Sequence, residues 1–275
     1  MRAEAAPSAS MLRTVLTKTL RDQRRALSWW SLGSVLTVLM YSAFWPSVHA
    51  NAGQFSRYIE KLPEAIRNMM GGANFGTPEG YVQTELFSLL GPILLLVYAI
   101  GAGARAVAGE EEGGTLDLLL SAPVSRRRVL LDKFGSMVWA TLLLGAVMCL
   151  SLMVLGPVYD LHLPLQGLAA ATLNLFLLAL AFGVIALSVG AATGSRSVAV
   201  GLSSGLAVIT FVLNTLAPSV DALRPFRFLS TFHYYSGHAP LTHGWGGMDI
   251  LVLAGISAVA LVIGLITFER RDLAA

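Results

Sequence analysis

Residues 161–195 read LHLPLQGLAAATLNLFLLALAFGVIALSVGAATGS, a stretch that contains no Asp, Glu, Lys or Arg. A helix needs about 20 apolar residues to cross the hydrocarbon core of a bilayer, and this stretch is longer. A charged side chain at the bilayer centre costs about 3 kcal/mol on insertion scales, so membrane spans are nearly free of charge. The stretch therefore predicts a transmembrane helix, and other charge-free intervals should mark further spans.

Further charge-free intervals of similar length predict five more spans. The six spans are expected at about residues 27–47, 86–108, 134–156, 166–192, 198–217 and 249–268. One more charge-free interval, 228–248, contains three histidines, four glycines and a proline, a composition that disfavours a lipid-facing helix. We expect that interval to form an extramembrane or re-entrant loop. The predicted fold is an all-α membrane protein with six transmembrane helices, in which residues 26–275 form a single domain.

The composition agrees with a membrane protein. The chain has 275 residues, of which 55% are hydrophobic and 13% are charged, and its net charge is +3. A soluble domain carries about 25% charged residues, which excludes an ordinary soluble protein, and the high hydrophobic content excludes a disordered one. The single cysteine, Cys149, excludes an internal disulfide, and the near balance of 19 basic and 16 acidic residues disfavours nucleic-acid binding.

The basic residues lie mostly on one side of the predicted spans. Six spans put both chain ends on the same side, and 14 of the 19 Lys and Arg residues fall there. Because Lys and Arg concentrate in cytoplasmic loops, we expect both termini in the cytoplasm. The tryptophans agree, since each lies at a predicted membrane interface: Trp29, Trp30, Trp45, Trp139 and Trp245.

Segments outside the spans have patterns of their own. Residues 1–10 are expected to be disordered, whereas residues 11–25 combine leucines at helical spacing with several cationic residues. That pattern suits an amphipathic helix in the inner headgroup layer, with a simple charged flank of the first span as the alternative. Residues 48–84 are expected to form a structural lid over the outer ends of the bundle.

The loop between the second and third spans is the most informative segment outside the membrane. Residues 109–133 read GEEEGGTLDLLLSAPVSRRRVLLDK. The acids suit a helix N-terminus, Pro123 ends that short helix, and Ser125 can cap the next one. An apolar face is formed by three leucines at helical spacing, Leu116, Leu119 and Leu120. Periodicity alone supports two interpretations equally: the face docks into a groove on another protein, or it packs under its own bundle.

This loop resembles a known one. The sequence from Glu110 to Arg128 is similar to the first cytoplasmic loop of ABC transporter permeases of the type-2 exporter superfamily. The six spans and the tail around Phe268, Arg270, Arg271 and Asp272 also resemble that family. The resemblance implies a coupling helix that docks on a separate ATPase, with residues 11–25 as a second contact. The residues implied in coupling are Glu110, Glu111, Glu112, Gly114, Thr115, Leu116, Leu119, Leu120, Pro123, Val124, Ser125 and Arg126.

The resemblance also implies a function. The chain would be the permease subunit of an ATP-driven exporter in a bacterial cytoplasmic (inner) membrane, and not itself an enzyme. It would work with two copies of an ABC ATPase, which hold ATP and Mg, and with a second permease chain, identical or paralogous.

The residues themselves add two expectations about ligands. Lys18, Lys61 and Lys133 are the only lysines, and none follows a glycine, so the phosphate-binding loop G-x-x-x-x-G-K-[ST] is absent. We therefore expect no cofactor on this chain. The uncharged interior favours a lipophilic or amphipathic substrate, such as a drug, an antibiotic or a lipid-like compound.

Two other functions remain as alternatives. Ser203 lies in a G-x-S-x-G pattern, which would make the chain an intramembrane serine hydrolase, but that motif requires a strand, a turn and a helix. Within a predicted helix, Gly201 and Gly205 instead form G-x-x-x-G, as do Gly190 and Gly194, and we expect both pairs to pack the hairpin of spans four and five. The other alternative is a non-transporting assembly or sensor subunit.

Polar residues supply candidates for ligand contact. Tyr41, Tyr98, Asn174 and Asn214 lie at membrane depth and are candidates for the substrate path, although such residues more often hydrogen-bond a neighbouring helix. The histidines all fall on the predicted outer side without a standard ligand spacing, so we expect no metal site: His49, His162, His233, His238 and His243.

Overall fold

The computed structural model describes residues 8–59, 61–63, 66, 76–116 and 125–271. These residues contain no strand, and six of their helices are long and apolar enough to cross a membrane. The candidate spans are Gln23–Ala50, Pro78–Ala106, Arg126–Val158, Leu165–Thr193, Arg196–Leu216 and Gly247–Arg270. The prediction of an all-helical protein with six spans is confirmed.

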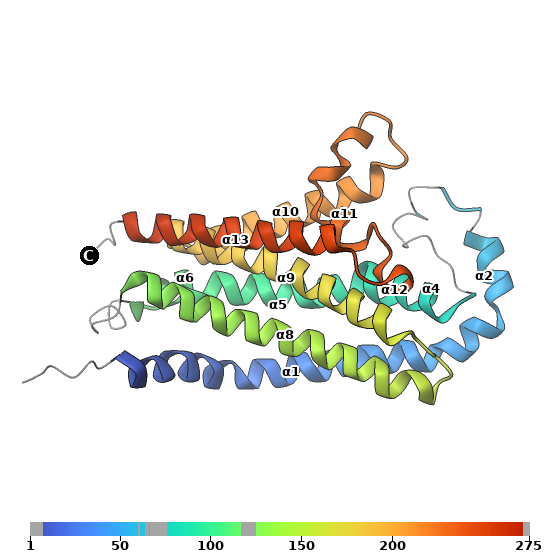
Figure 1. The fold of residues 1–275 in the computed structure, drawn as a ribbon, viewed down its shortest axis with the longest axis horizontal. Helices are drawn as coiled ribbons and strands as arrows, with labels where there is room; N and C mark the ends of the chain where they lie inside the picture. Colours follow the sequence, from blue (N-terminus) through green and yellow to red (C-terminus); the bar gives the residue numbers. More distant parts are fainter. Residues whose placement is uncertain (1–7, 60, 64–65, 67–75, 117–124, 272–275) are drawn as a thin grey trace, which may run out of the picture.

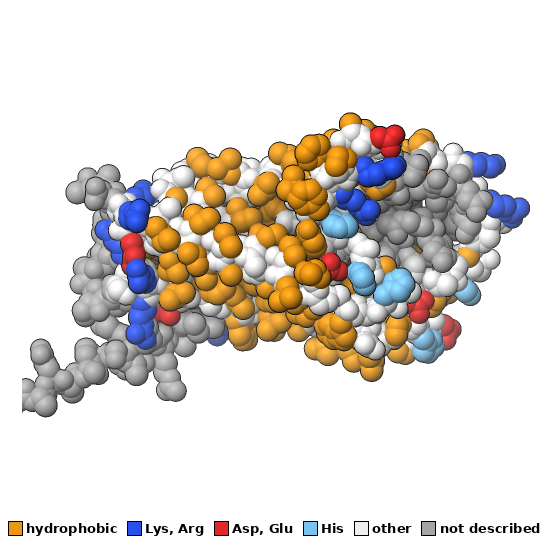
Figure 2. Space-filling view, turned by 45° about the horizontal axis from the view of Figure 1, so that its top comes forward, with side chains coloured by type: hydrophobic (Ala, Val, Ile, Leu, Met, Phe, Trp, Pro, Cys, Tyr) orange, Lys and Arg blue, Asp and Glu red, His pale blue; other side chains and the backbone are white. Residues whose placement is uncertain are grey.

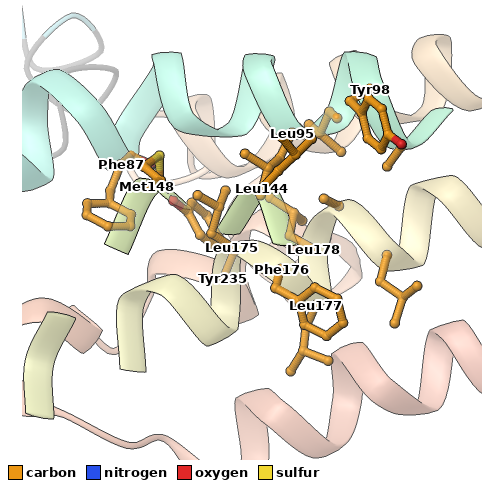
Figure 3. Packing of buried hydrophobic residues seen from close by; sticks show 14 of the residues in the cluster. Phe87, Leu95, Tyr98, Leu144, Met148, Leu175, Phe176, Leu177, Leu178 and Tyr235 are labelled. Carbon is orange, nitrogen blue, oxygen red and sulfur yellow. Dashed lines mark hydrogen bonds between the residues drawn. The ribbon is translucent and has the colours of Figure 1, made fainter. Parts of the chain in front are cut away.

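The spans lie side by side along the long axis of the molecule (Figure 1). Helix α9 (Leu165–Thr193) is central and contacts α5 (Gly91–Ala106), α8 (Arg126–Val158), α10 (Arg196–Leu216) and α13 (Gly247–Arg270). Helix α1 (Ser8–Ala50) lies at one edge, where it packs against α8. Large buried side chains from α5, α8 and α9 meet in one cluster, which Figure 3 shows around Leu95, Leu144 and Leu175.

Small residues bring two of these helices into close contact. A Cβ atom added to Gly103 of α5 would clash with the backbone oxygen of Gly183 of α9. Glycine at this position therefore lets the two backbones touch, as is common between membrane helices. A hydrogen bond joins α9 to α13, where Ser188 Oγ donates to the carbonyl oxygen of Ala260 at 2.7 Å.

The two ends of the bundle differ. The chain enters α1 and leaves α13 at the same end, which also holds α6 (Ala108–Glu112), and we call it the termini end (Figure 1). The opposite end, which we call the loop end, holds α2 (Ala52–Ile59), α11 (Thr231–Ser236) and α12 (Pro240–His243). Figure 2 shows hydrophobic side chains along the sides of the spans and charged side chains gathered toward the two ends.

The N-terminal helix differs from expectation. Instead of a separate helix over 11–25, α1 runs without a break from Ser8 to Ala50. The sequence from Ser8 to Leu32 contains neither Gly nor Pro, so nothing in it interrupts the helix. Residues 1–7 of the predicted disordered segment lie outside the described residues.

The second span also differs from expectation. It begins at Pro78, ahead of the predicted range 86–108, as α4 (Pro78–Val82) followed by the π-helix η1 (Gln83–Leu90) and α5. Thr77 caps the start, since its side-chain oxygen accepts a 3.2 Å hydrogen bond from the Gly80 N–H. Measuring spans by charge-free intervals missed this first part because Glu85 interrupts the interval. Of the predicted lid 48–84, most of 64–75 lies outside the described residues.

The interval 228–248 turns back into the bundle. Its helix α11 follows the 3-10 helix η2 (Arg224–Leu229) and contacts α9, α10 and α13. The Tyr235 hydroxyl donates a 2.6 Å hydrogen bond to the Phe87 carbonyl, and Ser230 Oγ donates one of 2.6 Å to the Thr210 carbonyl. Both acceptors lie within candidate spans, so this segment packs against the spans at the loop end.

Candidate functional site

The predicted coupling loop begins at the termini end, where α5 passes through Val107 into α6. The chain then turns at Gly113 and Gly114, the latter in the left-handed region with φ of 65°, and residues 117–124 lie outside the described part. Four predicted coupling residues fall in that gap: Leu119, Leu120, Pro123 and Val124. Helix α8 resumes the described chain at Arg126.

The first acid of the loop forms an ion pair with α8. The Glu110 carboxylate contacts the Lys133 amino group, whose side chain is 7% exposed. The second carboxylate oxygen of Glu110 is buried and has no hydrogen-bond partner among the described residues. A cation this deeply buried depends on its partner, because a lone charge away from water is costly.

The second and third acids contact two other elements. Glu111 Oε2 accepts a 2.9 Å hydrogen bond from Arg271 Nη1, just past the end of α13. Glu112 Oε1 accepts a 2.8 Å hydrogen bond from the backbone N–H of Arg196, the first residue of α10. A helix N-terminus has free N–H groups and a partial positive charge, so a carboxylate stabilises it there.

Arginines at the start of α8 hold the end of α13. Arg126 Nη1 donates hydrogen bonds to the carbonyl oxygens of Arg271 at 2.6 Å and Phe268 at 3.3 Å. A cation at a helix C-terminus satisfies free carbonyls and complements their negative charge. Nearby, the exposed Arg127 pairs with Glu269 at 2.8 Å between Nη2 and Oε2. We call this network, without the exposed Arg127–Glu269 pair, the termini clasp: Glu110, Glu111, Glu112, Arg126, Lys133 and Arg271. Its members are buried or half-buried except Glu112, which is exposed.

Leu116 does not lie on an exposed face. It is 3% exposed and packs in a cluster with Val107, Leu130, Leu187 and Phe268. The turn at Gly114 returns the chain toward the bundle, so Leu116 follows the interpretation in which the loop packs under its own spans. The structure thereby removes it from any face presented to a partner.

The remaining described coupling residues lie at the surface. Gly114, Thr115 and Ser125 are exposed. Ser125 occupies the predicted capping position before α8, but its side chain makes no capping hydrogen bond. These three residues flank the undescribed 117–124 on both sides.

The candidates for a substrate path all make contacts inside the bundle. The Tyr41 carbonyl accepts a 2.9 Å hydrogen bond from the Tyr81 hydroxyl, and the Tyr98 hydroxyl donates one of 3.2 Å to Gln23 Oε1. Two asparagine side chains also form hydrogen bonds. Asn174 Nδ2 donates one of 3.3 Å to the Tyr235 carbonyl, and Asn214 Oδ1 accepts one of 3.4 Å from Arg227 Nε. The contacts of Tyr98, Asn174 and Asn214 fit the interpretation that such side chains join neighbouring segments, whereas Tyr41 takes part in its bond to Tyr81 through its backbone carbonyl.

Glu85 is a charged residue within a span that the sequence reasoning missed. It borders a cavity between α1 and the second span, together with Tyr41, Ser42 and Tyr81. Ser42 is 1% exposed, and its hydroxyl oxygen has no hydrogen-bond partner among the described residues. The cavity has a volume of about 10 Å³, which is the room that one water molecule needs.

Ser203 lacks the surroundings of a nucleophile. Its Oγ is buried, with no hydrogen-bond partner among the described residues, so no general base contacts it. The neighbouring Gly201 and Gly205 do not pack the hairpin of α9 and α10 as predicted: a Cβ added to either would have nothing within 4 Å. Only the first glycine of the other pair packs as expected, since Gly190 faces Ala108 and Ala199.

The histidines lie at the loop end. His238 and His243 have ring centroids 6.4 Å apart, and the described residues contain no group of His, Cys, Asp and Glu that could hold a metal ion. Burial lowers the pKa of His233, and the Arg227 charge lowers it further, while Asp249 opposes the shift. A neutral imidazole at this position fits the packing of α11 against the bundle.

Comparisons with known proteins agree on one family. Residues 13–273 match the family model described as ABC-2 family transporter protein. A curated protein of Pseudomonas aeruginosa, named "Probable ABC transporter permease protein NosY", is 31% identical over 138 residues. That similarity covers 49% of this chain and 49% of the relative, so the chain spans about half the length of the curated protein it matches.

Proposed function

The chain belongs to the family of ABC-2 transporter proteins, and from this premise we propose that it is the permease subunit of an ATP-driven exporter. The observation that carries the proposal is the family match over residues 13–273, which includes all six spans and the loop between the second and third. A multi-pass membrane protein of this family works with an ABC ATPase.

The orientation follows from charge. Of the 19 Lys and Arg residues, 14 belong to segments at or leading to the termini end. Because cytoplasmic loops carry the excess of Lys and Arg, the termini end faces the cytoplasm. The membrane is the bacterial cytoplasmic (inner) membrane.

The ATPase docks at the termini end. Residues 117–124, flanked by the exposed Thr115 and Ser125, supply the contact, with Leu119 and Leu120 as its apolar anchors. Residues 11–25, in the N-terminal part of α1, supply a second contact. Two ATPase copies hold ATP and Mg, because this sequence has no phosphate-binding loop.

A second permease chain, identical or paralogous, completes the pathway. The open surfaces of Gly201 and Gly205 on α10 support this, since glycines spaced four apart let a second membrane helix approach closely. The substrate is a lipophilic or amphipathic compound such as a drug, an antibiotic or a lipid-like molecule. The scarcity of charge within the spans supports that class.

The docking proposal is tested by substituting both anchors, Leu119→Asp with Leu120→Asp. We expect the amount of ABC ATPase that co-purifies with the tagged permease from membranes to fall at least tenfold, while membrane insertion is kept. The matched control is Val220→Asp with Leu229→Asp, two exposed apolar residues at the loop end. Unchanged co-purification in the first variant would contradict the proposal.

A further inference from the structure

Each of three consecutive acids in the termini clasp holds a different span. Glu110 contacts Lys133 on α8, Glu111 contacts Arg271 after α13, and Glu112 accepts the N–H of Arg196 at the start of α10. Helix α6, which carries these acids, follows α5 after Val107 alone. A displacement of this short segment therefore pulls on three spans besides its own.

We propose that Glu110 and Glu111 transmit the ATPase-driven movement inside the permease and are not contacts for the ATPase, while the exposed Glu112 adds a link to the start of α10. This inference rests on the proposed function and assigns these residues a different role within it. The acids transmit by positioning the ends of α8, α10 and α13 relative to α5. Arg271 is the central partner because the loop reaches it from both sides.

The two sides of the loop meet at Arg271. On the entry side, Glu111 binds the Arg271 guanidinium, which also donates to the Ala191 carbonyl at 3.4 Å. On the exit side, Arg126 binds the Arg271 carbonyl oxygen at 2.6 Å. A force on residues 117–124 thus reaches the end of α13 through both flanks.

Glu110 and Glu111 are half-buried and already paired, whereas Glu112 is exposed. The side chains of Glu111 and Arg271 are 25% and 21% exposed, and Lys133 is more enclosed still. An ATPase surface would have to displace Arg271 before it could bind the Glu111 carboxylate. The uncompensated charge left behind would offset much of the gain.

The turn between α9 and α10 leaves space for the same ion pair. Gly194 ends α9 with φ of 68°, a conformation that favours glycine. A Cβ added there would lie 2.7 Å from Glu111 Oε1 and would collide with the Arg271 guanidinium. Glycine at this position therefore leaves space for the Glu111–Arg271 ion pair and also permits the positive φ of the turn.

The test is a charge exchange in the permease–ATPase complex, reconstituted in lipid nanodiscs. Glu111→Arg and Arg271→Glu each place like charges in contact, and the double variant restores an opposite pair. We expect both single variants to keep the co-purifying ATPase but to lose permease-dependent ATP hydrolysis at least fivefold. The double variant should recover at least half of it. Arg270→Glu is the matched control for Arg271→Glu, since it alters an exposed neighbour and changes the net charge by the same amount.

Two results would overturn the inference. One is loss of the co-purifying ATPase in the Glu111 variant without recovery in the double variant, because that pattern marks a contact with the ATPase. The other is unchanged hydrolysis in the single variants. If the reversals do not accumulate in the membrane, the single variants Glu111→Gln and Arg271→Gln are measured instead. Unchanged hydrolysis in both, or loss of the co-purifying ATPase in Glu111→Gln, would overturn the inference. Failure of the proposed function itself would show earlier, as no ATPase bound to the unchanged permease.

Discussion

The termini end and the loop end of the bundle are held together by different chemistry. At the termini end, the contacts between segments are mainly charged, and they converge on the short helix α6 and on Arg271. At the loop end, neutral groups join α11 to the spans: the Tyr235 hydroxyl donates to the Phe87 carbonyl, Ser230 donates to the Thr210 carbonyl, and the Asn174 amide of α9 donates to the Tyr235 carbonyl. Charged contacts respond to a partner's field, to salt and to displacement, whereas buried neutral bonds change little. This contrast fits a termini end that the ATPase displaces and a loop end whose structure stays fixed.

The largest loss of stability is expected at Lys133, the most buried residue of the termini clasp. Lys133→Met leaves the half-buried Glu110 carboxylate without its cation, and we expect the free energy of unfolding to fall by about 3–5 kcal/mol. Thermal unfolding in detergent, followed by size-exclusion chromatography, measures the loss. Adding Glu110→Gln to Lys133→Met should restore part of the stability, and a double variant as unstable as the single one would show that the pair is not the cause.

A smaller effect is expected at the loop end. Tyr235→Phe removes the hydroxyl that binds the Phe87 carbonyl at 2.6 Å, and the cost of one buried neutral hydrogen bond is about 1 kcal/mol. The same unfolding measurement, repeated at low and high salt, should give the same loss at both. A strong salt dependence would remove the distinction drawn between the two ends.

The smallest effect is expected at the exposed edge of the termini end. Arg127→Ala breaks the pair with Glu269, but the Arg127 side chain is 66% exposed, so the loss of stability is small and decreases with salt. Unfolding of this variant beside Lys133→Met at matched salt separates the two. Losses of equal size would mean that burial does not set the strength of charged contacts here.

The spans were predictable because a single property, the absence of charge, defines them. The same property misplaced the start of the second span, since Glu85 lies inside it and the bilayer tolerates a carboxylate near a helix end better than at the centre. The long helix α1 was predicted as two pieces because its amphipathic part and its apolar part differ in composition, although no residue interrupts the backbone.

The pairing within the clasp was not predictable. The acids from Glu110 to Glu112 and the basic residues at the other span ends were visible on one side of the sequence. Which ones meet depends on the packing of α8, α9 and α13, and Arg271 lies 160 residues from its partner Glu111. The burial of Leu116 likewise depends on a backbone turn at Gly114, which the spacing of the leucines does not predict.

The unbroken helix α1 has a mechanical consequence. Its 43 residues span about 65 Å at 1.5 Å per residue, whereas a bilayer with its headgroups is about 40–45 Å thick. About 20 Å of its length exceeds that thickness, so α1 must tilt in the bilayer or extend past the headgroups. Because α1 packs along α8, a change in the tilt of α1 would also move α8.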